Sequence, residues 1–156
     1  MNQSSKVLWT VETGGDNDST PVVDASGNVY FASDDGIVRA FGPGKSERWK
    51  FEVGFPVRAP LGLYADKTLY VSTYGKEPAV IALNARDGRE IWRFQVQPGV
   101  GDFYGIQSGV TTDAKGYAYF GARDHYVYSL TPSGSLSWKY KTGDQVDASP
   151  VFGPDG

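Results

Sequence analysis

The sequence contains no cysteine, which excludes disulfide bonds, thiol chemistry and cysteine-ligated metal sites for these 156 residues. It has no run of 18 apolar residues, so it predicts no membrane-spanning helix. It has only one histidine and no long basic run, which argues against a histidine-based metal site and against a nucleic-acid surface. The opening stretch MNQSSKVLW lacks an apolar segment of signal-peptide length.

Aromatic residues, glycine and proline are abundant instead. Aromatics make up 14% of the chain, which also has 20 glycines and 9 prolines. Aromatic and β-branched residues favour strands, whereas glycine and proline favour turns. No segment shows the sustained 3.6-residue period of an amphipathic helix. The composition therefore predicts one all-β domain of many short strands.

The four tryptophans mark a repeat. They are separated by intervals of 40, 43 and 46 residues, and each begins a short alternating strand: WTVET, WKFEV, WRFQV and WKYKT. About ten residues further on, a step of small residues leads into an apolar run, as in STPVVD and ASPVFG. Repeats of 20–50 residues are typical of solenoids, propellers or arrays. The tryptophans are Trp9, Trp49, Trp92 and Trp138.

Each repeat holds four strands joined by turns of hairpin length, which is typical of a propeller blade. We therefore predict a β-propeller of four-stranded antiparallel blades, with about three and a half blades in an open arc. The predicted segments are an outer strand over 6–13, blades over 17–53, 57–96 and 105–142, and the start of a further blade over 147–156, with its inner strand over 147–152.

This pattern resembles the pyrroloquinoline-quinone-type (PQQ-like) propeller repeat. The family's docking motif reads Ala-x-Asp/Asn-x-x-Thr/Asp-Gly-Lys/Arg-x-x-Trp. Residues 82–92, ALNARDGREIW, match this motif in full, and AFGPGKSERW and SLTPSGSLSW are shorter versions of it. A tryptophan ring buries about 150–250 Å², so we expect all four tryptophans to join neighbouring blades, helped by Ala82 and Gly88. The motif is filled without a gap by Ala82, Asn84, Asp87, Gly88, Arg89 and Trp92.

The family resemblance implies two kinds of function, because the repeat serves both dehydrogenases and non-enzymatic scaffolds. The dehydrogenase branch implies a PQQ cofactor, a Ca²⁺ ion held by carboxylates and amides, and often a vicinal disulfide. The disulfide is excluded here, and we find no acidic cluster with calcium-site spacing. The BamB-like branch, a periplasmic lipoprotein of the β-barrel assembly machinery, fits better, although this chain lacks the lipobox cysteine of that branch.

We therefore expect a non-enzymatic module without a cofactor, which binds a protein or polymer partner. One alternative is part of a PQQ-dependent dehydrogenase, with PQQ and calcium. A second alternative is a sensor or carbohydrate-binding propeller. The resemblance suggests a periplasmic or other extracytoplasmic compartment, which the residues themselves leave open.

Two connections are longer than their counterparts and predict a binding site. They are QPGVGDFYG over residues 97–105 and TYGKEPA over residues 73–79. In a four-stranded antiparallel blade both connections emerge on the same face, where aromatics mixed with charges suit a partner. The alternative is a loop-length drift without function. The candidate residues are Tyr74, Lys76, Glu77, Asp102, Phe103 and Tyr104.

Three other stretches are interpreted as turns. His125 has no second histidine to work with, and Asp34–Asp35–Gly36 lacks the later ligands of an EF-hand loop. In GPGK at 42–45 the second glycine and the Ser/Thr are misplaced for a phosphate loop, and no helix pattern follows. Because propellers close into rings of about 4–8 blades, we also expect the arc to be part of a larger ring and to self-associate through open blade edges.

Overall fold

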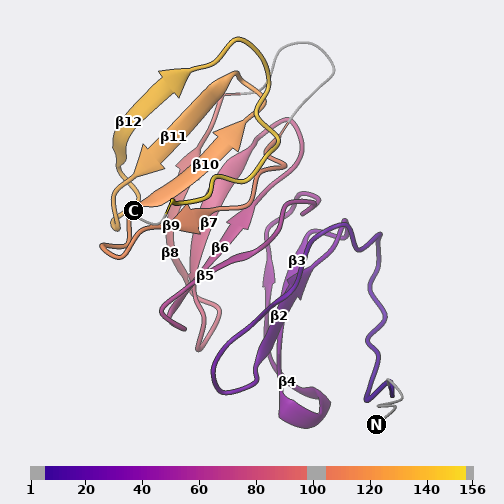
Figure 1. Cartoon of the computed structure of the whole chain (residues 1–156). Coiled ribbons are helices and arrows are strands. Elements are labelled where there is room, and N and C mark those ends of the chain that lie inside the picture. Colours follow the sequence, from indigo (N-terminus) through magenta and orange to yellow (C-terminus); the bar gives the residue numbers. More distant parts are fainter. Residues whose placement is uncertain (1–5, 98–104, 154–156) are drawn as a thin grey trace, which may run out of the picture.

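The computed structural model describes residues 6–97 and 105–153, which form three four-stranded antiparallel sheets (Figure 1). Blade 1 consists of β1 (Val22–Val23), β2 (Val29–Ala32), β3 (Ile37–Gly42) and β4 (Ser46–Glu52), with a 3-10 turn at Pro43–Lys45. Blade 2 consists of β5 (Gly62–Tyr64), β6 (Thr68–Ser72), β7 (Ala79–Asn84) and β8 (Glu90–Gln95). Blade 3 consists of β9 (Thr111–Thr112), β10 (Ala118–Ala122), β11 (Tyr126–Leu130) and β12 (Leu136–Lys141).

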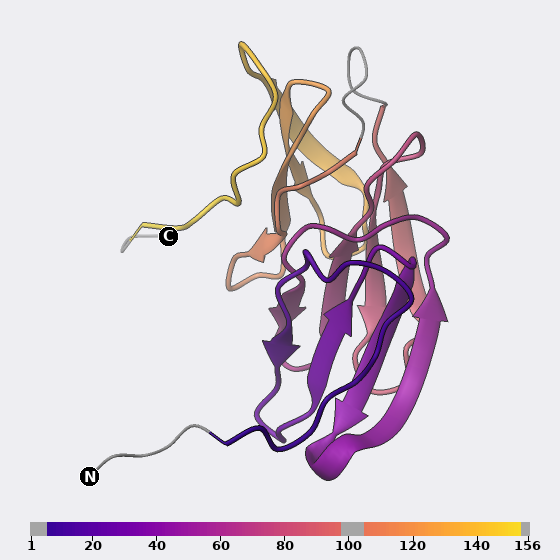
Figure 2. The same ribbon diagram turned by 90° about the vertical axis from the view of Figure 1, so that its right-hand side faces the viewer.

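Within each blade, strands adjacent in sequence pair with one another, and the sheets follow each other in chain order (Figures 1 and 2). The prediction of an all-β propeller with four-stranded antiparallel blades is confirmed. Residues 6–13 and 147–152 differ from the prediction, because neither segment contains a strand. A strand needs a neighbour to complete its backbone hydrogen bonds, and no strand of the described chain pairs with either segment.

The hydrophobic core lies between blades rather than within them. We call the side of a blade that faces the next blade its trailing face, and the opposite side its leading face. Seam 1 joins the trailing face of blade 1 to the leading face of blade 2. Seam 2 joins blades 2 and 3 in the same way. The buried residues form two clusters, one at each seam, with Val38 and Leu69 in seam 1 and Val80 and Phe120 in seam 2.

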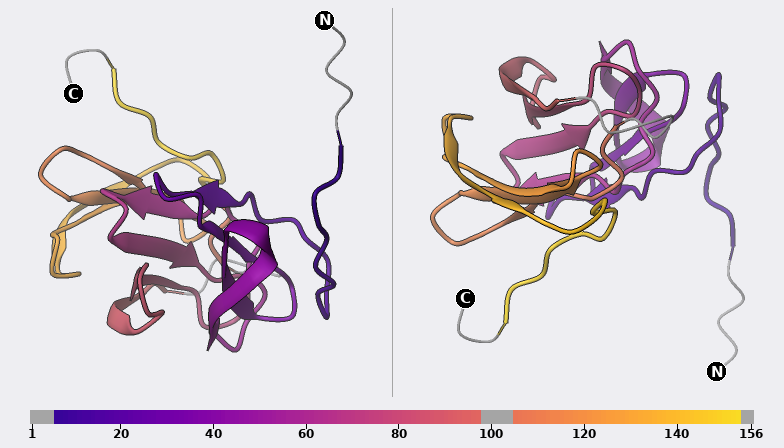
Figure 3. Two further views of the ribbon diagram at one scale, coloured as in Figure 1. Left: turned by 90° about the horizontal axis from the view of Figure 1, so that it is seen from below. Right: turned by 90° about the horizontal axis from the view of Figure 1, so that it is seen from above.

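Blade 2 shows the effect of being covered on both faces. Consecutive side chains of a strand point to opposite faces, and yet Val80 and Ile81 of β7 are both fully buried. Outer strand β12 of blade 3 is exposed along its whole length. Seen from below and from above, the three sheets follow one another, with blade 2 in the middle (Figure 3). Burial therefore depends on whether a neighbouring blade is present.

Candidate functional site

Connections from all three blades meet on one face of the arc. The Tyr74 backbone N–H donates to the Pro56 carbonyl at 2.8 Å, and the Ile106 N–H donates to the Thr73 carbonyl at 3.1 Å. Gly105 lies so close to Tyr74 that a β-carbon on this glycine would come within 2.8 Å of the tyrosine ring. The described ends of the two long connections therefore lie side by side at Tyr74.

Tyr74 is held between two arginines. The Arg58 guanidinium carbon lies 4.5 Å from the centre of the Tyr74 ring, and that of Arg123 lies 5.6 Å from it. Arg123 also donates to the tyrosine hydroxyl at 3.5 Å. Contacts of this kind contribute about 0.5–2 kcal/mol, more where water is excluded. The ring is half-buried and has a fixed orientation.

Each arginine is in turn held by an aspartate of another connection. Arg58 binds Asp34 through Nε and Nη2, with the shortest contact at 2.7 Å, and Arg123 binds Asp147 through the same two atoms at 2.8 Å. Hydrogen bonds to these carboxylates raise the pKa of both guanidinium groups above the ordinary value for arginine. Both arginines therefore remain charged and oriented. We call this set the polar arc; it consists of Asp34, Arg58, Tyr74, Gln107, Arg123 and Asp147.

The residues of the polar arc come from two positions that recur in the repeat: one follows the second strand of a blade, and the other precedes the first strand of the next blade. Asp34, Tyr74 and Arg123 all follow the second strand of their blade, four residues after an equivalent tyrosine. Arg58 and Gln107 precede the first strand of the next blade, and Gln107 accepts from Arg123 at 2.7 Å. The side chains therefore form a continuous chain across three blades. They offer hydrogen-bond donors, acceptors and an aromatic ring, but no activated nucleophile.

The structure places three of the predicted binding residues on this face. Tyr74 is half-buried in the polar arc, whereas Lys76 and Glu77 beside it are exposed. Asp102, Phe103 and Tyr104 lie outside the described residues. The interpretation from the sequence did not single out Arg58 and Arg123. A comparison of the residues that follow each second strand, rather than of loop lengths, includes Arg123 but not Arg58, which precedes a first strand.

Trp49 and Trp92 lie at the two seams and bind the next blade in the same way. The Trp49 indole N–H donates to the Ala85 carbonyl at 3.0 Å, and that of Trp92 donates to Pro132 at 3.1 Å. Each ring lies against a glycine of the turn before the next outer strand, Gly88 for Trp49 and Gly134 for Trp92. The motif glycine therefore contacts the tryptophan of the preceding blade, not the one four residues later in its own blade.

The other two tryptophans differ from the expectation that all four join blades. Trp138 is 46% exposed, and its indole N–H has no acceptor within the described chain. Trp9 lies beside blade 1, with its ring centre 6.0 Å from that of Phe41. Both differ for the same reason, because joining two blades requires a complete blade on each side of the ring. Ala82, fully buried, pairs with Trp92 in the sheet register.

The remaining candidates have structural roles. His125 has a φ of +71°, close to the +72° of Gly36 at the equivalent turn of blade 1, and its carbonyl accepts from Thr142. Asp35 accepts from Arg39 and from the Ile37 N–H within its own hairpin. Within residues 6–97 and 105–153, no three His, Cys, Asp or Glu side chains lie together in a way that could hold a metal ion.

Comparison with known proteins agrees with this repeat geometry. A family model described as "Outer membrane protein assembly factor BamB" matches residues 76–153, which is half of the chain. The chain belongs to the BamB family. The BamB protein of Escherichia coli K12 is 33% identical over 91 residues, covering 56% of this chain and 23% of that protein. This chain thus spans about a quarter of the length of that BamB relative.

Solved structures show the same fold. BamB from Moraxella catarrhalis superposes with a TM-score of 0.68 at 18% identity, covering 86% of this chain and 39% of that one. Quinohemoprotein alcohol dehydrogenase from Comamonas testosteroni gives a TM-score of 0.67 at 19% identity, covering 81% and 21%. At such identities the likeness shows the propeller fold alone. No helix within the described part of this BamB-family chain has the length and hydrophobicity needed to cross a membrane.

Proposed function

We propose that this chain is a non-enzymatic propeller module that binds a protein partner on the face of the polar arc. The process we propose is the assembly of outer membrane proteins. Membership of the BamB family supports a scaffold role, and the relatives are outer membrane protein assembly factors, which suggests the process. The observation that carries the binding face is the Tyr74 ring held between Arg58 and Arg123.

This arrangement suits recognition because it is ordered before a partner arrives. Tyrosine and arginine are enriched at the centres of protein interfaces. Binding usually costs about 0.5–1.5 kcal/mol for each side chain that must be immobilised. The ion pairs of Arg58 and Arg123 reduce this cost, because they already fix the two guanidinium groups. Exposed Lys76 and Glu77 provide a polar rim beside the ring.

The donors that remain indicate which groups the partner offers. Arg58 uses Nε and Nη2 for Asp34, and within the described chain its Nη1 makes no hydrogen bond. The Arg58 side chain is 34% exposed, so part of it is open to solvent. A carboxylate or a backbone carbonyl of the partner would accept from it, next to an apolar group stacked on Tyr74. An extended polypeptide provides both.

A site-specific cross-linking experiment tests this binding face. A photoreactive amino acid replaces Lys76, or in a matched control Lys50, which is also exposed but lies on outer strand β4. The probe is a purified outer-membrane β-barrel protein diluted from urea. We expect cross-links from position 76 and not from position 50, and we expect Tyr74→Ala to weaken them. Equal cross-linking at both positions, or none from position 76, would contradict the proposed face.

We propose that the module works without a bound cofactor. A PQQ site of the dehydrogenase type requires a calcium ion held by several oxygen ligands. The donor set of the described chain does not fit, because its carboxylates are held singly, by arginines or by their own turns. A rise in melting temperature on adding PQQ and Ca²⁺ to the full chain would contradict this.

A further inference from the structure

The face opposite the polar arc is formed by two turns of each blade. These turns join the first strand to the second and the third strand to the fourth, so they emerge at the same end of an antiparallel sheet. Hydrogen bonds link them within and between blades. The Ala85 N–H donates to the Lys67 carbonyl at 2.8 Å, and the Ala25 N–H donates to the Asp66 carboxylate at 3.2 Å. We call the surface that these turns form the turn face.

The turn face carries exposed basic side chains from all three blades. Arg48 of β4 reaches this face, where it donates to the Asn28 side chain at 2.9 Å. Within residues 6–97 and 105–153, only Arg89 among these cations forms an ion pair, with Asp87 at 3.8 Å. The others are therefore available to an anionic partner. The exposed basic residues of the turn face are Lys45, Arg48, Lys67, Arg86, Arg89 and Lys115.

Two carboxylates of the turn face are engaged by their own turns. Asp24 accepts from the backbone N–H groups of Ser26 and Asn28, at 2.9 Å and 2.8 Å. Asp113 accepts in the same way from two backbone N–H groups of its turn in blade 3. Both aspartates are half-buried, whereas the lysines of the turn face are exposed. The side chains that extend furthest into solvent at this face are therefore mainly cationic.

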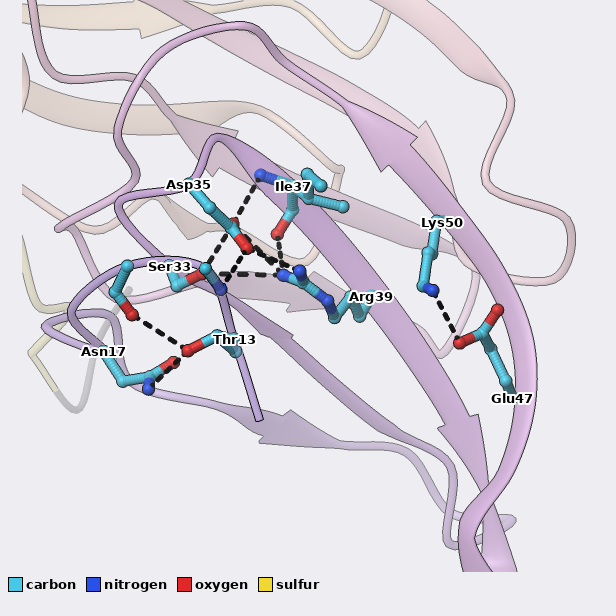
Figure 4. Close-up of polar contacts among 10 residues, drawn as sticks. Thr13, Asn17, Ser33, Asp35, Ile37, Arg39, Glu47 and Lys50 are labelled. Carbon is cyan, nitrogen blue, oxygen red and sulfur yellow. Dashed lines mark hydrogen bonds and ion pairs between the residues drawn. The ribbon is translucent and has the colours of Figure 1, made fainter. Parts of the chain in front are cut away.

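The face of the polar arc has the opposite charge balance. Its exposed carboxylates outnumber its exposed lysines, Lys76 and Lys141, and its two arginines are each paired with an aspartate. Between the two faces, Glu47 and Lys50 of outer strand β4 form an ion pair at 3.0 Å (Figure 4). The chain has a net charge of −3, but its positive charge gathers at the turn face. The exposed carboxylates of the polar-arc face are Asp16, Asp18, Glu77, Asp144 and Asp147.

Exposed apolar side chains lie beside the cations of the turn face. Val7 and Leu8 are 74% and 84% exposed. Both line a groove of about 510 Å³ together with Gly27 and Pro43, which belong to turns of this face. Cations attract anionic lipid headgroups, and apolar side chains enter the boundary between headgroups and acyl chains. The combination is therefore typical of a surface that binds a membrane peripherally.

We propose that the turn face binds the surface of a bilayer that contains anionic phospholipids. Its cations are spread over turns of three blades, so they suit a surface of many phosphate groups and not a single anion. Val7 and Leu8 favour a lipid surface over an acidic protein, because a bilayer can bury them. Binding in this orientation leaves the polar arc directed away from the membrane. The two faces are separate, so this proposal and the proposed function can fail independently.

Co-sedimentation of the full chain with lipid vesicles tests the proposal. The vesicles contain equal parts of phosphatidylglycerol and phosphatidylcholine, or phosphatidylcholine alone, and we expect binding to the anionic vesicles only. The test variant combines Lys67→Glu and Lys115→Glu. The matched control combines Lys76→Glu and Lys141→Glu, which change the net charge equally but lie at the opposite face. Each basic residue near an anionic bilayer strengthens binding about fivefold, so we expect the test variant to lose about 25-fold or more and the control much less.

A third variant separates a lipid partner from an acidic protein. Leu8→Ser should weaken binding to anionic vesicles about fourfold or more, which corresponds to one buried methylene group. Absence of binding to anionic vesicles, or equal losses for the two double variants, would overturn the proposal. An acidic protein partner would be indicated instead if poly-glutamate displaced the chain from vesicles and Leu8→Ser had no effect. Melting temperatures of all variants establish that each is folded.

Discussion

Trp92 and Trp138 occupy the same place in blades 2 and 3, and a comparison of the two separates what a blade does alone from what its neighbour adds. Both tryptophans pair with the third strand of their blade, and both pack against the tyrosine of the second strand at 5.7 Å and 6.0 Å. Trp92 also donates to Pro132 and lies under Gly134, whereas Trp138 is 46% exposed. The pairing of tyrosine with tryptophan therefore forms within a blade, and the next blade adds burial and a hydrogen bond.

Trp49 in seam 1 is more deeply buried than Trp138. Trp49 is only 9% exposed, and its indole N–H donates to Ala85 of the next blade. Burial of a large ring contributes through the area removed from water, about 25 cal/mol per Å². We therefore expect the free energy of unfolding lost on removing a tryptophan to increase with the burial of its ring, so that the loss is largest for Trp49 and smallest for Trp138.

The largest expected effect is that of Trp49→Ala. Removing this ring leaves a cavity in seam 1 and an unpaired carbonyl on Ala85, and we expect it to lower the free energy of unfolding by about 3–5 kcal/mol. Trp138→Ala removes the same side chain from an exposed position and should cost less than about 1 kcal/mol. Urea unfolding followed by circular dichroism measures both. Similar losses for the two variants would show that the ring acts within its own blade.

The sequence predicts the blades well because their determinants are local. Alternating apolar residues set the strands, and glycine turns set the hairpins, so the spacing of the tryptophans is enough to place three blades. The two terminal segments, 6–13 and 147–152, were predicted as strands but contain none, although their sequences repeat the blade pattern. Pairing depends on a neighbouring strand, which is a property of the fold and not of the segment.

The candidate site could be predicted only in outline. The lengths of two connections pointed to the face of the polar arc and to Tyr74, because insertions alter loops and not strands. Arg58 and Arg123 could not be found in this way, since each lies in a connection of ordinary appearance and binds Tyr74 across a blade boundary. Contacts between side chains 49 residues apart, such as that of Arg123 with Tyr74, depend on how the blades are stacked.

A smaller effect is expected when alanine replaces glycine in the turns. Gly134→Ala should lower the free energy of unfolding by about 2–4 kcal/mol, because it adds overpacking against Trp92 to the strain of a left-handed residue. Gly44 has a similar φ of +73°, but a β-carbon there would meet no heavy atom within 4 Å among the described residues, so Gly44→Ala should cost only the strain of about 1 kcal/mol. Thermal and urea unfolding of both variants gives the difference. Equal losses would mean that the close approach of glycine to tryptophan contributes nothing to the seam.

The smallest effect concerns the tyrosines that support the tryptophans. The Tyr30 hydroxyl, in seam 1, donates to Asp24 at 2.9 Å. The Tyr119 hydroxyl, on the trailing face of blade 3, donates to Asp113 at 3.2 Å. Tyr30→Phe should cost about 1–2 kcal/mol at neutral pH, because it removes a hydrogen bond to a charged acceptor at a buried site. Tyr119→Phe should cost less than about 1 kcal/mol, because water reaches that side chain. Urea unfolding at pH 7 compares the two.

The same pair of variants has a distinct signature in alkaline solution. Burial, and then the hydrogen bond to Asp24, raises the pKa of Tyr30 to about 12. In the unfolded chain a tyrosine titrates near pH 10, so the folded state holds this proton more tightly. Its contribution to stability is therefore complete below about pH 10 and is lost as the pH rises from about 10 to 12. Tyr30→Phe should flatten the decline of stability in that interval more than Tyr119→Phe, and an unchanged slope would show that the folded chain holds this proton no more tightly than the unfolded chain.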